Sequence, residues 1–200
     1  MPPTVPLLDP SGYFRRDDRP SLAIGAGLVA VLALANAILA VGLVFLLADQ
    51  TTIPPGAGLL AGVAGLFAAA LELFGRPIVW VVLSGIAHVF LMIWDAEGEI
   101  TETLAVVGEA EMAGLVLFPV QAGLAAYLVV NAPTDPAAVS EVTSGQPFTV
   151  ALSFATIVWK ALIQGIGLGE VHGVSTAKTL TLTMALGLLV FSPGLLSLIL

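Results

Sequence analysis

Long apolar runs separated by short polar stretches make up the chain from residue 22 to its end. The runs are continuous and do not alternate between apolar and polar positions, which is the pattern of membrane-spanning helices and not of a β-barrel. Runs near or above about 20 residues are long enough to cross a bilayer. The sequence therefore predicts an all-α polytopic transmembrane helical bundle. We expect five spans, at about residues 22–48, 77–94, 103–130, 148–166 and 178–200.

The apolar segment 57–74 is the ambiguous part of this pattern. It is rich in Gly and Ala, and it ends at the Gly-Arg-Pro sequence of residues 75–77. Proline disfavours a helical conformation in the residue before it, so the apolar pattern is interrupted there. The segment fits a sixth span, or a re-entrant or interfacial helix that leads into the next span.

Basic residues favour the arrangement with five spans. Lys and Arg close to spans stay on the cytoplasmic side. Five spans place five of the six basic residues inside, whereas six spans divide them four to two. We therefore expect a re-entrant or interfacial helix at 57–74, a cytoplasmic tail over residues 1–20 and a transmembrane domain over 21–200. The tail carries Leu7, Leu8, Tyr13 and Phe14, which fit a position on the membrane surface; a disordered tail is the alternative.

The composition indicates a membrane protein and limits the classes of partner that it can bind. Hydrophobic residues make up 58% of the chain and charged residues 10%, against about 25% charged residues in a soluble domain. The net charge of −8 argues against binding to nucleic acid. The excess of acidic residues favours a protein from a halophile. The alternative explanation is chance, because few loop residues contribute to the count. Cysteine is absent, which excludes disulfides and Cys-ligated metal.

Ionisable residues in or beside the spans form the candidate polar cluster. His88 lies six residues before one apolar run ends, and Glu109 lies seven residues into the next helix. At 1.5 Å per residue, both are about 9–10 Å from the loop between them. We therefore expect His88 beside Glu109, with Glu170 and His172 on the same side of the membrane. A proton relay, ion site or metal site is the functional interpretation, and an interhelical hydrogen bond is the structural one.

Enzymatic and metal chemistry have weaker support in the sequence. Two histidines with carboxylates suit zinc or a similar metal, but the chain has no HxxxH or HExxH pattern. Ser84 and His88 are four residues apart on one helix, which does not make a nucleophile–base pair. Glu111 points away from the helix face that Glu102 and Glu109 share. We expect no catalytic residue and no cofactor, and the sequence leaves a metal open.

Two stretches resemble the Yip1 family in its archaeal form. Residues 88–110 are similar to the family pattern of a helix with His, a glycine turn and Thr-Leu-x-Val-Val-Gly-Tyr-Ala. Residues 167–178 are similar to its Gly-Leu-x-x-Val-His-Gly-Leu-Ser-Thr pattern near the last span. The turn departs from the pattern at Asp95 and Ala96, and Glu109 replaces an aromatic residue, so the carboxylate at 109 is particular to this chain. The motif residues are Gly98, Thr103, Gly108, Gly173, Ser175 and Thr176.

The resemblance implies a cell-membrane protein with five spans, a cytoplasmic N-terminus and both motif loops on the cytoplasmic side. Eukaryotic members of the family are linked to Rab GTPases and vesicle traffic, partners that an archaeal member is not expected to share. We expect a non-enzymatic protein that organises membranes or recruits a cytoplasmic partner. Gly58 and Gly62 suit close helix packing, within the chain or in a homo-oligomer.

Two alternative functions stay open at this point. The first is a small ion- or proton-coupled transporter or channel that uses the His/Glu cluster near the cytoplasmic side. The second is an intramembrane metalloprotein or enzyme. Both require the four candidate residues to converge on a polar cavity.

Overall fold

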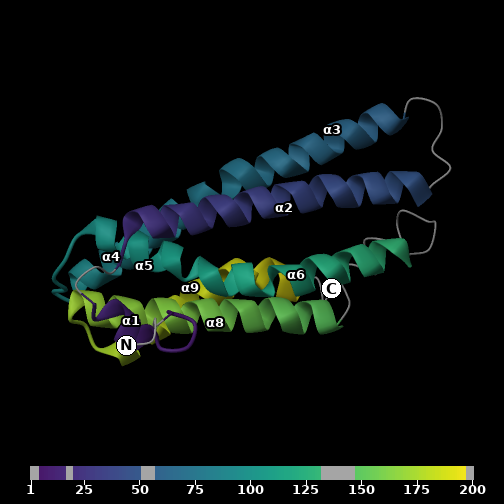
Figure 1. The fold of residues 1–200 in the computed structure, drawn as a ribbon. Helices are drawn as coiled ribbons and strands as arrows, with labels where there is room; N and C mark the ends of the chain where they lie inside the picture. The colour runs from purple at the N-terminus through teal and green to yellow at the C-terminus, as the bar shows by residue number, and fades with distance from the viewer. Residues whose placement is uncertain (1–4, 17–19, 51–56, 132–146, 197–200) are drawn as a thin grey trace.

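The computed structural model describes residues 5–16, 20–50, 57–131 and 147–196 (Figure 1). All regular elements in these ranges are helices, which confirms the predicted all-α fold. They are α1 (Pro10–Phe14), α2 (Leu22–Gln50), α3 (Ala57–Ala70), the π-helix η1 (Leu71–Gly75), α4 (Arg76–Ile93), α5 (Ile100–Glu109), α6 (Glu111–Val130), α8 (Pro147–His172) and α9 (Thr176–Leu196).

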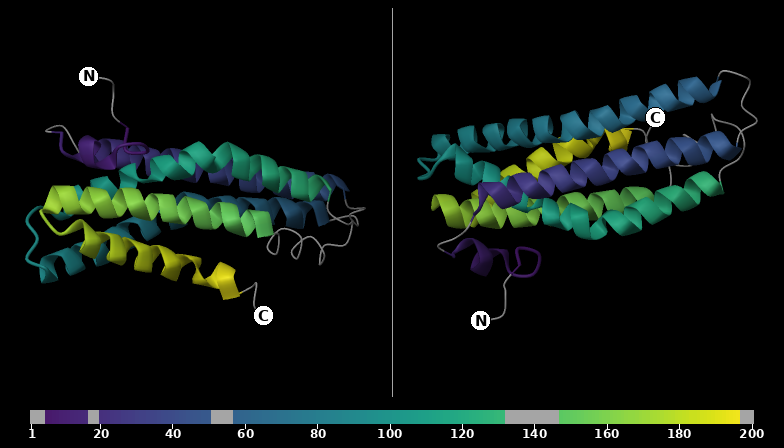
Figure 2. Two further views of the ribbon diagram at one scale, coloured as in Figure 1. Left: turned by 90° about the horizontal axis from the view of Figure 1, so that it is seen from below. Right: turned by 45° about the horizontal axis from the view of Figure 1, so that its top comes forward.

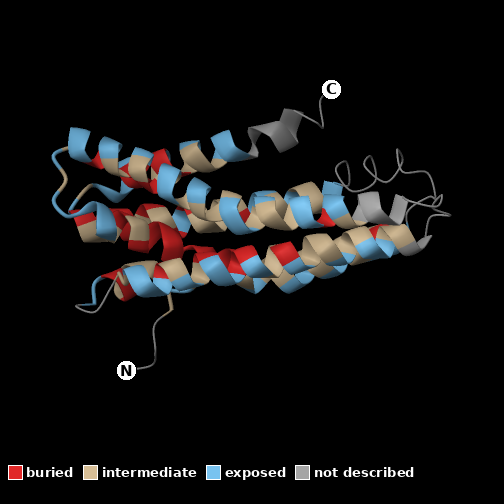
Figure 3. Cartoon of the chain, turned by 90° about the horizontal axis from the view of Figure 1, so that it is seen from above, coloured by how far each residue is buried: buried red, intermediate tan, exposed pale blue. Residues whose placement is uncertain are grey.

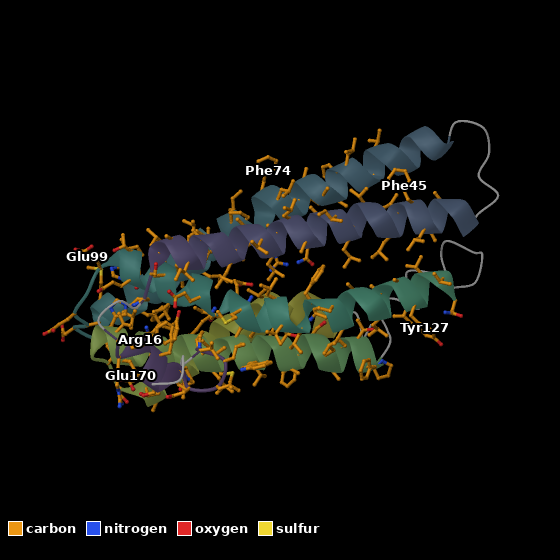
Figure 4. All side chains as sticks on the ribbon, viewed as in Figure 1. Arg16, Phe45, Phe74, Glu99, Tyr127 and Glu170 are labelled. Carbon is orange, nitrogen blue, oxygen red and sulfur yellow. The ribbon has the colours of Figure 1, made fainter. Side chains whose placement is uncertain are left out.

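Four helical stretches within these ranges are long and apolar enough to cross a membrane. They are Leu22–Ala48, Gly62–Ile93, Ile100–Val130 and Pro147–His172, and a shorter apolar helix covers Thr176–Val190. Large apolar side chains such as Phe45 and Phe74 lie exposed on the outer surface (Figure 4). A chain that exposes so many such side chains along its helices has lipid as its natural surroundings.

The segment 57–74 leads into the next helix without a break, and a re-entrant or interfacial position for it stays a prediction. α3, η1 and α4 follow one another without a break. α3 and η1 pack along α2, and α4 packs against α5 (Figures 1 and 2). Pro77 has no N–H to donate, but it lies in the first turn of α4, directly after the wider turn of η1. The proline therefore does not end the helix.

One end of the bundle gathers segments that are far apart in the sequence. The N-terminal helix α1, the turn between α4 and α5 and the turn between α8 and α9 all lie at this end (Figures 1 and 2). Many of the buried residues lie toward the same end (Figure 3). The core there contains Tyr13, Phe14, Leu91, Val106 and Leu168. We call this end the turn end of the bundle.

Glycines set the closest helix contacts in the bundle. A Cβ atom added at Gly108 of α5 would lie 2.7 Å from the Cα atom of Gly25 in α2. A Cβ atom at Gly165 of α8 would lie 2.7 Å from the Cα atom of Leu180 in α9. Small residues allow backbones to approach closely in membrane bundles. Gly108, a motif residue, therefore fixes how α5 sits on α2.

Candidate functional site

Two histidines and a threonine form a chain of hydrogen bonds at the turn end. Thr103 Oγ1 lies 3.0 Å from His88 Nδ1 and 3.0 Å from His172 Nε2. The two imidazole rings are 6.1 Å apart, centroid to centroid. His172 Nδ1 lies 2.6 Å from the carbonyl oxygen of Glu97. Since these residues come from α4, α5 and α8, the chain joins three helices.

The Glu97 carbonyl fixes the direction of these hydrogen bonds when both imidazoles are neutral. A carbonyl oxygen only accepts, so His172 Nδ1 carries the proton and donates it. His172 Nε2 then accepts from the Thr103 hydroxyl, and the Thr103 oxygen accepts from His88 Nδ1. Each polar atom between His88 and Glu97 thus has a defined partner. The geometry is that of a structural link in which both rings are held in place.

The local sequence of the α4–α5 turn positions His172. Gly98 has a φ of +104°, and a Cβ atom there would lie 2.7 Å from His172 Nδ1. Only glycine fits this position without strain or collision. The Glu97 amide donates back to the His172 carbonyl at 3.3 Å. A capping box between Glu99 and Glu102 then starts α5, one turn before Thr103.

Glu109 does not join His88, contrary to our expectation. It is fully buried on α5, and its Oε1 accepts a hydrogen bond from the backbone N–H of Ser21 at 2.6 Å. Ser21 immediately precedes α2, so the carboxylate lies at the positive end of that helix. Our calculation of depth along each helix did not consider the direction in which a side chain points around the helix axis. Glu109 lies next to Gly108 on the face of α5 that packs against α2, whereas Thr103 faces α4 and α8.

Glu170 holds the N-terminal segment instead of contributing to a cluster with the histidines. Its Oε1 accepts from Ser11 Oγ at 2.6 Å and from Arg15 Nη2 at 2.8 Å, and its Oε2 accepts from Arg15 Nε at 2.7 Å. The paired contacts are the fork geometry that Arg makes with a carboxylate. The hydrogen bond to Glu170 raises the pKa of Arg15 above its ordinary value.

Aromatic residues complete the docking of residues 5–16 on α8. Phe14 is buried against Gly167, where an added Cβ atom would lie 2.7 Å from the phenylalanine ring. Trp159 donates through Nε1 to the carbonyl oxygen of Leu7 at 3.3 Å. This part of the tail is therefore packed on the protein and ordered, and a place on the membrane surface stays a prediction. Arg19 lies outside the described residues.

Deeper in the bundle, the structure brings together charges that the sequence did not connect. Glu111 is buried, and its Oε1 accepts a short hydrogen bond from Lys160 Nζ. Arg76 Nη1 lies 3.6 Å from Glu111 Oε2, and Arg76 Nη2 donates to Glu72 at 3.4 Å. The sequence signal for this group was the presence of charged residues within helices that we expected to span the membrane. Helical spacing placed Glu111 away from the Glu109 face but did not reveal its partners.

The remaining motif residues build the α8–α9 turn. Gly173 has a φ of +64° directly after α8, in the left-handed region that ends many helices. The carbonyl oxygen of Ser175 accepts from the amides of Lys178 and Thr179, and α9 begins at Thr176. Across the described ranges, no three His, Asp or Glu side chains are grouped so as to hold a metal ion. The motifs therefore specify turns and contacts in this structure.

Comparison with known proteins identifies one family. The family model described as the Yip1 domain matches residues 6–198, which is nearly the whole chain. The match includes the docked tail, both turns and every helix that lines the interior. Comparisons with curated proteins and with solved structures gave no match.

Proposed function

The chain belongs to the Yip1 domain family and is an integral membrane protein, and from that premise we propose that it recruits a protein with a basic surface to the cytoplasmic face of the cell membrane. In this proposal it catalyses no reaction. The turn end of the bundle is the recruiting surface. The proposal rests mainly on the hydrogen-bonded link from His88 through Thr103 to His172.

That link uses the two histidines to hold the turns in a fixed relation. The turn after α4 is bonded to the end of α8 through both the ring and the backbone of His172. A fixed surface loses little conformational entropy on binding, which favours recognition of a partner. The alternative transporter and metalloprotein functions needed His88, Glu109, Glu170 and His172 to converge. The contacts described above join the two histidines but hold both carboxylates elsewhere, so they give these alternatives no support.

Charge indicates the kind of partner. Asp95, Glu97 and Glu99 lie exposed on the turn between α4 and α5, and we call these three residues the acidic face (Figure 4 labels Glu99). Exposed charges of one sign steer a partner of the opposite sign and set its orientation. The partner that fits this surface presents Lys or Arg side chains.

The arginines beside the acidic face support a cytoplasmic orientation. Arg15 and Arg16 lie at the turn end, close to the start of the first long apolar helix (Figure 4 labels Arg16). Basic residues within a short distance of a span stay in the cytoplasm. The docked segment and both turns then face the same compartment.

Photocrosslinking in native membranes tests the proposal. In one variant, a photoreactive residue replaces exposed Thr101 beside the acidic face. In a second variant, the same residue replaces Tyr127, which is 64% exposed at the other end of the bundle. We expect a discrete protein adduct from position 101 and none of that mass from position 127. Excised adducts identify the partner by peptide mass spectrometry.

A neutralised variant supplies the decisive comparison. Asp95→Asn, Glu97→Gln and Glu99→Gln together remove the charge, while glutamine at 99 retains the capacity to form a capping box. The adduct from position 101 should fall several-fold in this variant and at raised salt. An adduct of unchanged yield, or the same adduct from position 127, would refute recruitment through the acidic face.

A further inference from the structure

A cavity of about 420 Å³ lies away from the turn end, inside the helical part of the bundle. Residues of η1, α4, α8 and α9 form most of its wall. The greater part of the lining is apolar and includes Leu83 and Leu186. Four charged residues also line it, and these are Glu72, Arg76, Glu111 and Lys160. We call it the Arg76 cavity.

The four charges of the Arg76 cavity balance one another. Lys160 Nζ donates a short hydrogen bond to Glu111 Oε1, and Arg76 Nη2 donates to Glu72 Oε2 at 3.4 Å. Arg76 Nη1 also lies 3.6 Å from Glu111 Oε2. Two cations therefore face two carboxylates, so the cavity calls for no ion. The ligand that suits this balance is uncharged.

The depth of the cavity favours the same kind of ligand. Lys160 lies 13 residues after Pro147 and 12 before His172, close to the middle of α8. At 1.5 Å per residue, each end of α8 is about 18–20 Å away. An ionised group is very costly to bring to such a depth. A neutral hydroxyl group costs far less there, and hydrogen bonds offset that cost.

Two buried atoms of the charged group have no hydrogen-bond partner among the described residues. They are Arg76 Nε, which is a donor, and Glu111 Oε2, which is an acceptor. Both side chains line the cavity. A hydroxyl group both donates and accepts, so a single hydroxyl serves the guanidinium group and the carboxylate at once. Buried polar groups without partners are costly, which favours a ligand that supplies both hydrogen bonds.

We propose that the Arg76 cavity binds a neutral lipid alcohol, which carries one hydroxyl group on a long hydrocarbon chain. The hydroxyl accepts a hydrogen bond from Arg76 and donates one to Glu111. The chain lies along the apolar wall that includes Leu83 and Leu186. A largely apolar pocket with a few convergent polar groups is the usual form of a site for such a ligand. This site is separate from the acidic face and does not depend on partner recruitment.

The helix packing gives a lipid alcohol a route into the cavity. α4 packs mainly against α5, and α9 packs mainly against α8, while α4 and α9 touch each other little. Both α4 and α9 line the cavity. Val79 of α4 and Val190 of α9 are exposed apolar residues of its lining. A long-chain ligand therefore enters sideways from the bilayer, between these two helices.

Photolabelling of the purified full-length chain in detergent micelles tests the site. The probe is an 18-carbon alcohol with a diazirine in the middle of its chain, and peptide mass spectrometry locates its crosslinks. We expect crosslinks in α4 and α9, and oleyl alcohol should compete with them. Oleyl methyl ether has the same chain but no O–H to donate. At equal mole fraction in the micelle it should compete at least about tenfold less well, because hydrogen bonds to charged groups are strong.

Two matched pairs of variants locate the binding, measured as the labelling that oleyl alcohol prevents. Arg76→Lys keeps the charge balance and removes the Nε–H donor, so it should lower this labelling several-fold. Arg16→Lys makes the same change at the turn end and should leave it unchanged. Val79→Trp fills the cavity border and should also lower it. Val81→Trp changes an exposed valine of the same helix that is not among the lining residues, and it should behave as the unaltered chain does.

Three results would overturn the proposal. Equal competition by oleyl alcohol and oleyl methyl ether would show that the apolar wall alone attracts the chain, without a site for the hydroxyl. Equal labelling of the Arg76→Lys and Arg16→Lys chains would mean that Arg76 does not hold the ligand. Equal labelling of the Val79→Trp and unaltered chains would show that no lipid alcohol enters the cavity, and that water alone serves its polar atoms.

Discussion

The Thr103 hydroxyl lies 3.0 Å from His172 Nε2, and this contact fastens α5 to the end of α8. Both residues are almost completely buried. Thr103 also accepts from His88, so one hydroxyl serves two rings. A buried polar group that loses its partner costs more than the bond itself contributes. The link is therefore a sensitive point of the turn end.

Thr103→Val should destabilise the protein by about 1–3 kcal/mol, because the valine keeps the shape and leaves both ring nitrogens without a partner. Thr103→Ser retains the hydroxyl and should cost clearly less. Exposed Thr101→Val is the control. Thermal unfolding in detergent micelles, followed by near-ultraviolet circular dichroism, measures the relative stability of the three variants. Equal unfolding temperatures for the valine and serine variants at 103 would contradict a hydrogen-bonded role.

Gly108→Ala should destabilise the packing of α2 on α5, since the new Cβ atom would lie 2.7 Å from the Gly25 Cα atom. Overpacking of this kind costs about 1–3 kcal/mol. Gly123→Ala is the matched control, because an added Cβ atom there has no heavy atom within 4 Å among the described residues. Helix propensity alone makes the control neutral or slightly stabilising. Parallel losses of stability in the two variants would rule out the close contact as the cause.

Phe14→Ala should release the N-terminal segment from α8, because the ring packs in the space over Gly167. Glu170→Gln should loosen it less, since the side chain of Arg15 is 67% exposed and water screens the pair. Leu8→Ala is the control, with its side chain 85% exposed. Hydrogen–deuterium exchange of peptides covering residues 5–16 reports the docking. The increase in exchange should be largest for Phe14→Ala, smaller for Glu170→Gln and smallest for Leu8→Ala, and a larger increase for Glu170→Gln than for Phe14→Ala would mean that the ion pair dominates.

Glu111→Gln should be among the most destabilising single changes, at about 3–5 kcal/mol, because it leaves Lys160 without its counter-charge inside the bundle. The double variant Glu111→Gln/Lys160→Met should recover much of that loss, since Arg76 retains Glu72. Thermal unfolding of the two single variants and the double variant forms a thermodynamic cycle. Strictly additive effects would show that the two side chains do not interact.

The helical fold could be predicted because continuous apolar runs of this length permit few other structures in lipid. The interruption that we expected at the Gly-Arg-Pro sequence of residues 75–77 does not occur, for a local reason. Proline disfavours an α-helical conformation in the residue before it, yet Arg76 has α-helical backbone angles, and the π-helical turn ends directly before it at Gly75. Whether a wider turn forms depends on how η1 and α4 pack against α2 and α5, which the sequence of the segment does not contain.

The site could be predicted only in part, for a geometric reason. Spacing along a helix gives depth, and together with the topology of five spans it placed His88 and His172 at one end of the bundle. It does not give the direction in which a helix is turned toward its neighbours, so Glu109 was paired with the wrong helix. The contact between Glu111 and Lys160 joins residues 49 positions apart. That contact arises from the packing of α6 on α8, which no local pattern specifies.

The docking of the N-terminal segment has a consequence for the order of biosynthesis. Ser11 and Glu170 bond across 159 positions of sequence. At a synthesis rate of about 5–20 residues per second, roughly 8–30 s pass between the appearance of the two residues. During that interval Tyr13 and Phe14 have no α8 to cover them. A segment made before the first long apolar helix thus reaches its final place only after α8 is made, and its docking marks a chain whose fourth long apolar helix has been made and packed.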